Sequence, residues 1–166
     1  MNIRSEAPSD WQAITTVTTA AFLEAEHSGG NEAEIIVALR EAGQLAVSLV
    51  ATENDGSIVG HIGFSPVLIN GRDAGWFGLA PVSVSPDRQG HGVGKKLVEA
   101  GLAILAAEGA AGCVVLGDPA YYSRFGFVAD PSLWLNGVPP EYFQVLQFGD
   151  LSCNGKVEFH PAFGPD

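Results

Sequence analysis

Apolar residues recur along the N-terminal part of the chain with the spacing of helices. Residues 8–10, Pro-Ser-Asp, can cap the start of a helix, and an apolar series follows them directly. The members of that series are Trp11, Ile14, Val17, Ala21 and Phe22. The same spacing predicts a second helix through Ile35, Ile36 and Leu39, which Gly43 can close.

Further along, runs of β-branched and apolar residues alternate with turn residues and predict strands. The predicted strands cover residues 2–6, 45–53, 57–69, the stretch that ends at Val84, 113–116, 143–148 and 156–160. Tight turns are predicted at 54–56 and 70–71. A long helix is predicted to run to about Glu108, with Gly109 as its cap, and a short helix near 119–125. Two helices, an antiparallel meander and a strand–helix–strand unit predict a mixed α/β (α+β) single domain over residues 1–166.

Composition fits a globular chain. At 166 residues, 46% of them hydrophobic, the chain is long enough for one domain with its own core. No charge-free run is long enough to span a bilayer, and residues 1–10 lack the apolar segment of a signal peptide. Cys113 and Cys153 form neither a disulfide framework nor a zinc site. We expect a cytoplasmic protein with no metal and no membrane partner.

Charge narrows the choice of partners. The formal net charge is −11, which argues against nucleic acid, because phosphate contacts need a basic surface. Three of the eight basic residues, Arg88, Lys95 and Lys96, crowd around one glycine-rich loop. Such a local basic patch suits a phosphate-rich cofactor.

That loop lies within Leu79 to Lys96, LAPVSVSPDRQGHGVGKK. An apolar strand containing Pro81 leads through a polar turn and three glycines into an amphipathic helix. Proline cannot donate to a sheet ladder, so we expect a bulge or an unpaired strand end there. Glycines leave backbone N–H groups open, and a helix N-terminus favours anions. The stretch therefore predicts a phosphate site.

Two familiar phosphate motifs do not fit this loop. The dinucleotide fingerprint is G-x-G-x-x-G, whereas Gly90, Gly92 and Gly94 read G-x-G-x-G. The P-loop needs Ser or Thr after its lysine to hold magnesium, whereas Lys95 is followed by Lys96. A nucleotide-binding protein of either kind is thus a poor fit.

The loop instead resembles the pyrophosphate loop of the GNAT superfamily of N-acetyltransferases, whose motif is Q/R-x-x-G-x-G/A. Gln89, Gly92 and Gly94 fill that motif, after a V-x-V-x-P strand end at residues 82–86. GNAT chains also carry Y-x-x-x-G-F after their fifth strand, and Tyr122 begins such a run in the sequence YSRFGF.

The two motifs stand in the family's order and together cover about a third of the chain. In His61 and the pair Tyr121-Tyr122, the sequence resembles the small bacterial YhbS-like branch of the family. The resemblance implies a central, mixed, mostly antiparallel twisted sheet, splayed between the fourth and fifth strands and flanked by helices.

The resemblance also implies acetyl-CoA as co-substrate. A main-chain edge would pair with the pantetheine arm, and the loop would hold the pyrophosphate. The residues assigned to cofactor binding are Val82, Ser83, Val84, Gln89, Gly90, His91, Gly92, Val93, Gly94 and Lys95. Arg88 and Lys95 or Lys96 are expected to add contacts to phosphates.

For catalysis, the resemblance assigns to Tyr122 the protonation of the departing CoA thiolate. Some relatives carry a glutamate on the strand before the loop, but Gly75 to Val84 contains no carboxylate. His61, Asp118 and a water chain remain alternatives for the general base. A strand histidine is more often structural, and Asp118 can instead cap the short helix after it.

The acceptor is expected to be a primary amine of a small molecule or of a protein or peptide. The family builds its acceptor pocket partly from the loop near residues 27–31, and the residues there do not identify the amine. The alternative function is an acyl-CoA-binding sensor of the same fold with little turnover. The resemblance also allows a homodimer.

Overall fold

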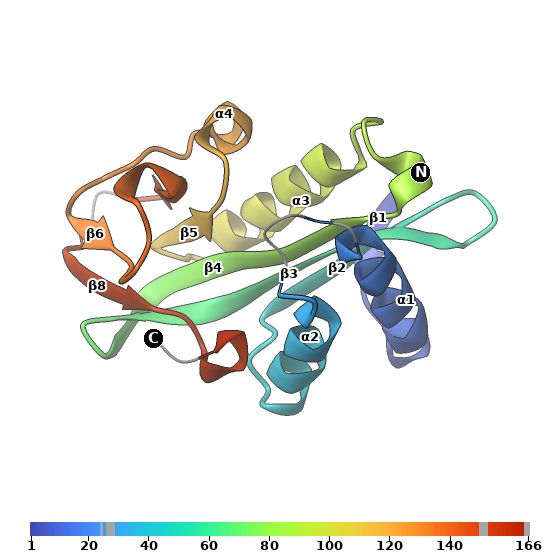
Figure 1. Ribbon diagram of the computed structural model, residues 1–166, viewed down its shortest axis with the longest axis horizontal. Helices are drawn as coiled ribbons and strands as arrows, with labels where there is room; N and C mark the ends of the chain where they lie inside the picture. Colours follow the sequence, from blue (N-terminus) through green and yellow to red (C-terminus); the bar gives the residue numbers. More distant parts are fainter. Residues whose placement is uncertain (24, 26–28, 150–152, 165–166) are drawn as a thin grey trace. The chain divides into compact units, whose positions relative to one another are not determined.

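Strands and helices follow one another along the chain in a mixed α/β order (Figure 1). The computed structural model describes residues 1–23, 25, 29–149 and 153–164. Its strands are β1 (Asn2–Ser5), β2 (Val47–Thr52), β3 (Ile58–Ile69), β4 (Arg72–Val84), β5 (Gly112–Leu116), β6 (Leu133–Trp134), β7 (Phe143–Gln147) and β8 (Gly155–Glu158). Its α-helices are α1 (Trp11–Phe22), α2 (Glu32–Glu41), α3 (Val93–Ala107) and α4 (Pro119–Tyr122).

The strands hydrogen-bond in the order β1-β2-β3-β4-β5-β7, and β8 pairs with both β3 and β6. The pairs β1–β2, β2–β3, β3–β8 and β5–β7 are antiparallel, whereas β4–β5 is parallel. The sheet is therefore mixed and mostly antiparallel, with helices flanking it, and the predicted fold class is confirmed.

Pairing between β4 and β5 is short. It joins Trp76, Phe77 and Gly78 to Gly112, Cys113 and Val114. Strand β4 continues to Val84, while the remaining residues of β5 pair with β7. Among the described residues, the recorded β4–β5 pairing thus ends at Gly78, three residues before Pro81. The resemblance implied that the fourth and fifth strands part, and a bulge or an unpaired strand end was expected at Pro81.

The chain packs as two compact units that share β3, β4 and α3. One comprises Met1–Phe64 and Ala80–Leu102, the other Ser65–Leu79 and Ala103–Asp166. In the first, an apolar cluster joins α1, α2 and β2 through Ile14, Ile36 and Val50. The core of the second contains Val67, Ile69, Trp76, Val114, Leu133, Phe143, Val145 and Val157. The single domain over residues 1–166 stays a prediction.

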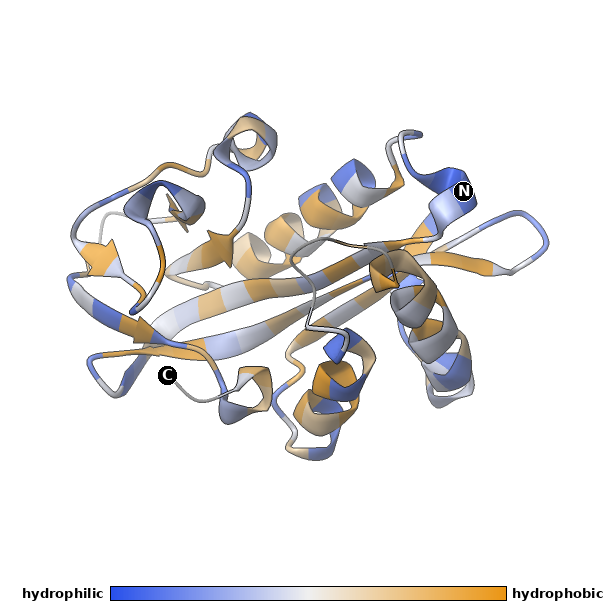
Figure 2. Cartoon of the chain, in the orientation of Figure 1, coloured by the Kyte–Doolittle hydropathy of each residue, from blue (hydrophilic) through white to orange (hydrophobic). Residues whose placement is uncertain are grey.

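Most predicted elements are confirmed to within two or three residues. The alternation of apolar and polar positions along α1 and α2 can be followed in Figure 2. Gly43 and Gly109 have positive φ angles, 69° and 84°, just beyond the ends of α2 and α3, as expected of helix caps. The sequence did not predict β6, because its two residues are too short to show a period.

A polar network lies beside the apolar cluster of the first unit. The Glu6 carboxylate, after β1, accepts bonds of 2.9 Å from Arg40 Nε, Arg40 Nη2 and Trp11 Nε1. The Ser48 hydroxyl also donates to Glu6, and Ser48 Oγ lies 2.8 Å from Nε2 of His61. Burial by itself would raise the pKa of Glu6, but the donors around it lower that pKa. Glu6 is therefore ionised at neutral pH.

His61 is fully buried on β3. Burial is the main reason why its pKa falls from 6.5 to about 4; Glu6 opposes the fall, and Arg40 adds to it. The folded chain keeps His61 neutral, whereas the unfolded chain protonates it below pH 6.5. Stability associated with His61 is thus fully present above pH 6.5 and is lost as pH falls towards 4.

We predict that wild type loses about 2 kcal/mol more of its unfolding free energy than His61→Gln between pH 7.5 and pH 5. Glutamine cannot titrate, so the difference between the two proteins isolates the histidine. Urea unfolding at both pH values measures it, with His91→Gln, at an exposed position, as the control. A pH-independent difference between wild type and His61→Gln would contradict the buried neutral histidine.

Candidate active site

The end of β4 presents backbone groups on the edge away from β3. The Ser85 N–H donates to the Val59 carbonyl at 2.8 Å, which places the main chain of residues 83 and 85 on the β3 side. Main-chain groups alternate along a strand, so those of Val82 and Val84 point the other way. The Val84 carbonyl there accepts a bond of 3.1 Å from Gln89 Nε2. The groups left for an added strand are Val82 N–H, Val82 C=O and Val84 N–H.

Ser83 differs from its two neighbours. Its side chain is buried and its hydroxyl donates to Thr18 Oγ1 of α1 at 3.3 Å. Its carbonyl lies 3.1 Å from where a Cβ on Gly60 of β3 would be. Ser83 therefore anchors the end of β4 to α1 and β3.

The glycine loop begins with a 3-10 turn at Pro86–Arg88 and ends at the start of α3. Gly90 and Gly92 have φ angles of 80° and 83°, which L side chains rarely adopt, and a Cβ on either would meet no atom within 4 Å. The Lys96 N–H bonds to the Gly92 carbonyl at 3.1 Å. The N–H groups of residues 93–95 precede that bond and have no intrahelical acceptor. They form an open N-terminus that suits an anion.

Two polar side chains of the loop are used within the loop itself. Gln89 donates to the Val84 carbonyl at 3.1 Å, and Nδ1 of His91 lies 3.0 Å from the Gln89 carbonyl, to which it donates. Gln89, at the first position of the motif, thus ties the loop back to the end of β4. This leaves backbone N–H groups as the loop's donors towards a ligand.

The basic residues of the loop divide into two kinds. Arg88 donates to Glu53 at 2.7 Å and to Asp87 at 3.3 Å, and these carboxylates raise its pKa. Lys95 and Lys96 are exposed, and neither has an ion-pair partner among the residues that the structure describes. The two lysines are therefore better placed than Arg88 to meet a phosphate.

Tyr122 lies in the second unit, at the end of α4. Its ring packs so closely on Gly117 that a Cβ there would lie 2.5 Å from it, and it meets the Phe127 ring edge-on at 5.9 Å. Gly126, with φ 96°, ends the following 3-10 turn. The residues of the Y-x-x-x-G-F motif therefore form a tightly packed turn that holds the Tyr122 ring in place. Burial raises the pKa of Tyr122 to about 12.

The neighbours of Tyr122 have structural contacts. Tyr121 is half-buried, and the Arg124 guanidinium lies 4.4 Å from the centre of its ring. Asp118 is the N-cap of α4: its Oδ1 accepts the Ala120 N–H at 2.9 Å. The capping role considered for Asp118 is what its contacts support.

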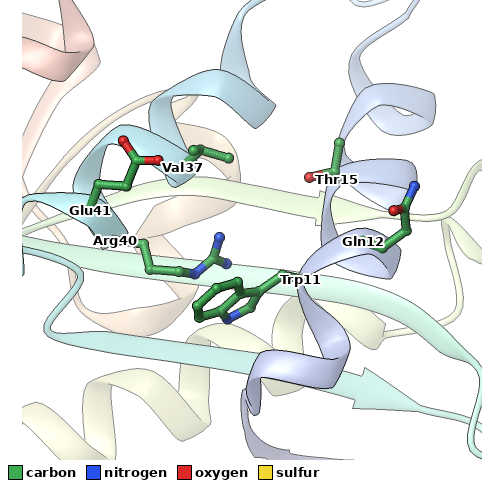
Figure 3. Close-up of a pocket in the computed structure, with 6 residues that line it drawn as sticks. All are labelled: Trp11, Gln12, Thr15, Val37, Arg40 and Glu41. Carbon is green, nitrogen blue, oxygen red and sulfur yellow. The ribbon is translucent and has the colours of Figure 1, made fainter.

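A surface pocket of about 320 Å³ lies between α1 and α2. It is lined by Trp11, Gln12, Thr15, Val37, Arg40 and Glu41 (Figure 3). The Arg40 guanidinium points towards the Trp11 indole, 4.7 Å from the ring centre. None of the predicted site residues lines it. Of the predicted acceptor loop near residues 27–31, residues 27 and 28 lie outside the described residues.

The group formed by Glu6, Ser48 and His61 could not be recognised from the sequence. The three residues belong to β1, β2 and β3 or their ends, and strand register brings them together. No described group of acidic, histidine and cysteine side chains is arranged to hold a metal ion. No helix in the described ranges has both the length and the apolar character needed to cross a membrane.

Comparison with known proteins agrees with these features. A family model for the acetyltransferase (GNAT) domain matches residues 44–129. The uncharacterized N-acetyltransferase YhbS of Escherichia coli (strain K12) is 40% identical over 169 residues, which cover 98% of this chain and 98% of YhbS.

Two crystal structures are also similar. A GNAT family acetyltransferase from Brucella melitensis in complex with acetyl-CoA is 51% identical, with a TM-score of 0.87 over 98% of this chain and 97% of that one. YhbS from Escherichia coli in complex with CoA is 37% identical, with a TM-score of 0.87 over 99% and 92%. The predicted family and its YhbS-like branch are confirmed: the chain belongs to the GNAT family of N-acetyltransferases.

Proposed function

We propose that this protein uses acetyl-CoA to acetylate a primary amine, of a small molecule or of a protein or peptide, by direct attack of the amine on the thioester. The observation that carries the proposal is the open N-terminus of α3 after a glycine loop, next to the free edge of β4. Relatives of the same family crystallised with acetyl-CoA and with CoA support this assignment of the cofactor.

In the proposed complex, the pantetheine arm pairs with the main chain of Val82 and Val84 as an added strand would. The N–H groups of residues 93–95 hold the pyrophosphate, and the positive end of the α3 dipole favours its charge. Lys95 and Lys96 add charge-assisted contacts. Arg88 keeps the loop in place through Glu53.

The reaction forms a bond from the amine nitrogen to the acetyl carbon and breaks the bond from that carbon to sulfur. The Val82 N–H polarises the carbonyl oxygen during attack. The phenol of Tyr122 gives its proton to the departing thiolate. Because its pKa is raised to about 12, Tyr122 is protonated at neutral pH and carries the proton that the thiolate needs. A homodimer stays a prediction.

One prediction of the proposed function concerns the cofactor. Acetyl-CoA and CoA, but not NAD or ATP, are expected to raise the melting temperature, by the equivalent of about 2.7 kcal/mol at a hundredfold excess over the dissociation constant. Gly92→Asp is expected to abolish this shift, because it places negative charge against pyrophosphate.

Gly92→Asn is the matched control for that variant. Asparagine has nearly the size of aspartate and meets the same φ of 83°, but carries no charge. It should keep a reduced shift. Equal shifts in wild type and in Gly92→Asp would contradict the loop assignment.

Another prediction of the proposed function concerns turnover. Tyr122→Phe is expected to lower kcat by about 100-fold, because a general acid contributes on the order of 10²–10⁴. Its acetyl-CoA melting shift should persist, since phenylalanine keeps the packing on Gly117 and Phe127. The assay follows free thiol with ethanolamine, tyramine, spermidine and a lysine-containing peptide as acceptors.

Tyr121→Phe is the control and should retain wild-type kcat. Wild-type activity in Tyr122→Phe would remove the phenol from the mechanism. A protein that binds CoA but acetylates none of these amines would favour the alternative function, an acyl-CoA sensor of the same fold.

A further inference from the structure

The hydrogen-bond directions around Ser48 fix the proton on His61. An ionised carboxylate only accepts, so the single hydroxyl proton of Ser48 goes to Glu6. Ser48 Oγ must then accept at its 2.8 Å contact with His61 Nε2. Neutral His61 therefore carries its proton on Nε2 and a lone pair on Nδ1.

That lone pair is buried without a partner. Nδ1 of His61 is buried from solvent, and no described residue donates a hydrogen bond to it. Buried polar atoms are nearly always paired, so an unpaired one calls for a partner, either an ordered water or a group that is bound during function. The other nitrogen of the same ring is fully engaged with Ser48.

The ring lies near the part of β4 where we place the thioester. A Cβ on Gly63 of β3 would lie 3.7 Å from Cε1 of His61, the ring carbon between Nδ1 and Nε2, and 3.4 Å from the Ala80 carbonyl oxygen. The histidine edge and the Ala80 carbonyl therefore flank the same bare stretch of backbone. Val82, whose N–H is assigned to the acetyl carbonyl, is two residues further on.

Resting on the proposed function, we propose that His61, Ser48 and Glu6 form a proton relay from the acceptor amine at the Ala80 segment of β4 to the Glu6 carboxylate. The evidence is a series of hydrogen bonds in which His61 Nε2 donates to Ser48 Oγ and Ser48 donates to Glu6. At the start of this series, the lone pair on Nδ1 of His61 is buried and has no described partner. Relay residues of this kind are not visible in the family's motifs, which contain none of the three.

The relay moves one proton and converts His61 from the Nε2–H to the Nδ1–H tautomer, so the ring must exchange its proton and return to the Nε2–H form before the next turnover. As the amine attacks, its N–H bond breaks and an N–H bond forms at Nδ1, directly or through one water. The Nε2–H bond of His61 breaks and a new O–H bond forms on Ser48. The former Ser48 proton passes to Glu6 Oε1, which then releases it to water.

Two features suit these residues to passing a proton on. They also make His61 a poor general base of the kind that keeps the proton as an imidazolium. Burial of the ring disfavours a lasting imidazolium; of the two charged groups that face the ring, Arg40 adds to this effect and Glu6 opposes it. Glu6, by contrast, keeps 14% of its side chain exposed, so it has contact with solvent. Arg40 and Trp11 hold the carboxylate in place while it exchanges the proton.

Nitrogen-15 NMR of the histidine rings tests the direction of the relay without any turnover. At pH 7.5, with and without CoA, we expect His61 to show a protonated Nε2 and an unprotonated Nδ1, assigned from the signals missing in His61→Gln. A proton on Nδ1 would overturn the relay.

Kinetics test its use, with the amine that wild type acetylates fastest among the four acceptors named above. His61→Gln keeps a donor to Ser48 but cannot pass a proton on, and Ser48→Ala breaks the chain at its centre. Both should lose about 100-fold in kcat with the KM for acetyl-CoA unchanged. Ser48→Thr keeps the hydroxyl and should stay within about threefold of wild type, well short of that loss.

The outcomes separate the two proposals. If wild type turns over and both His61→Gln and Ser48→Ala keep its kcat, the relay is overturned and the proposed function stands. If wild type acetylates none of the four amines, the proposed function fails. Variants that have lost the CoA melting shift are misfolded, and the NMR result on wild type then decides the direction of the relay.

Discussion

The structure depends on a strand whose two edges are used differently. Strand β4 pairs with β5 only as far as Gly78 and Val114, yet it runs on to Val84. Backbone donors and acceptors must find partners or water, so an edge left free at Val82 calls for something that can pair with it. An amide-containing chain such as pantetheine meets that need. The loop that follows, closed onto Val84 by Gln89, then delivers the helix N-terminus beside this edge.

Local features of the site were predictable because local chemistry determines them. The glycines at 90 and 92 adopt the positive φ angles that the loop requires, and Gly126 ends the turn after Tyr122 in the same way. The helix caps at Gly43 and Gly109 follow the same rule. Each of these can be recognised from a few neighbouring residues, which is why the motifs sufficed for the family.

What could not be predicted depends on residues far apart in the sequence. Arg88 is held by Glu53, 35 positions away, so its role in the loop is not visible from the motif. His61 meets Ser48 and Glu6 only because β1, β2 and β3 pair in their observed register. A shift of one residue would turn His61 to the other face of the sheet. Sequence alone therefore left His61, Asp118 and a water chain open as candidates for the base. Contacts distinguish the two side chains: the Asp118 carboxylate caps a helix, whereas Nδ1 of His61 has no hydrogen-bond partner among the described residues.

A chain of net charge −11 that binds a polyanion must do so locally. In physiological salt, screening limits the electrostatic effect of each surface charge to about 8 Å, so distant carboxylates have little effect at the loop. Near the loop, Glu53 and Asp87 already compensate Arg88. In the proposed complex, the attraction would then rest on the N–H groups of residues 93–95, the helix dipole and two lysines. Lysines are unfavourable at a helix N-terminus until an anion is bound. If the proposed complex is correct, Lys95 and Lys96 make the loop less stable without the cofactor and more stable with it, and both effects favour the bound state.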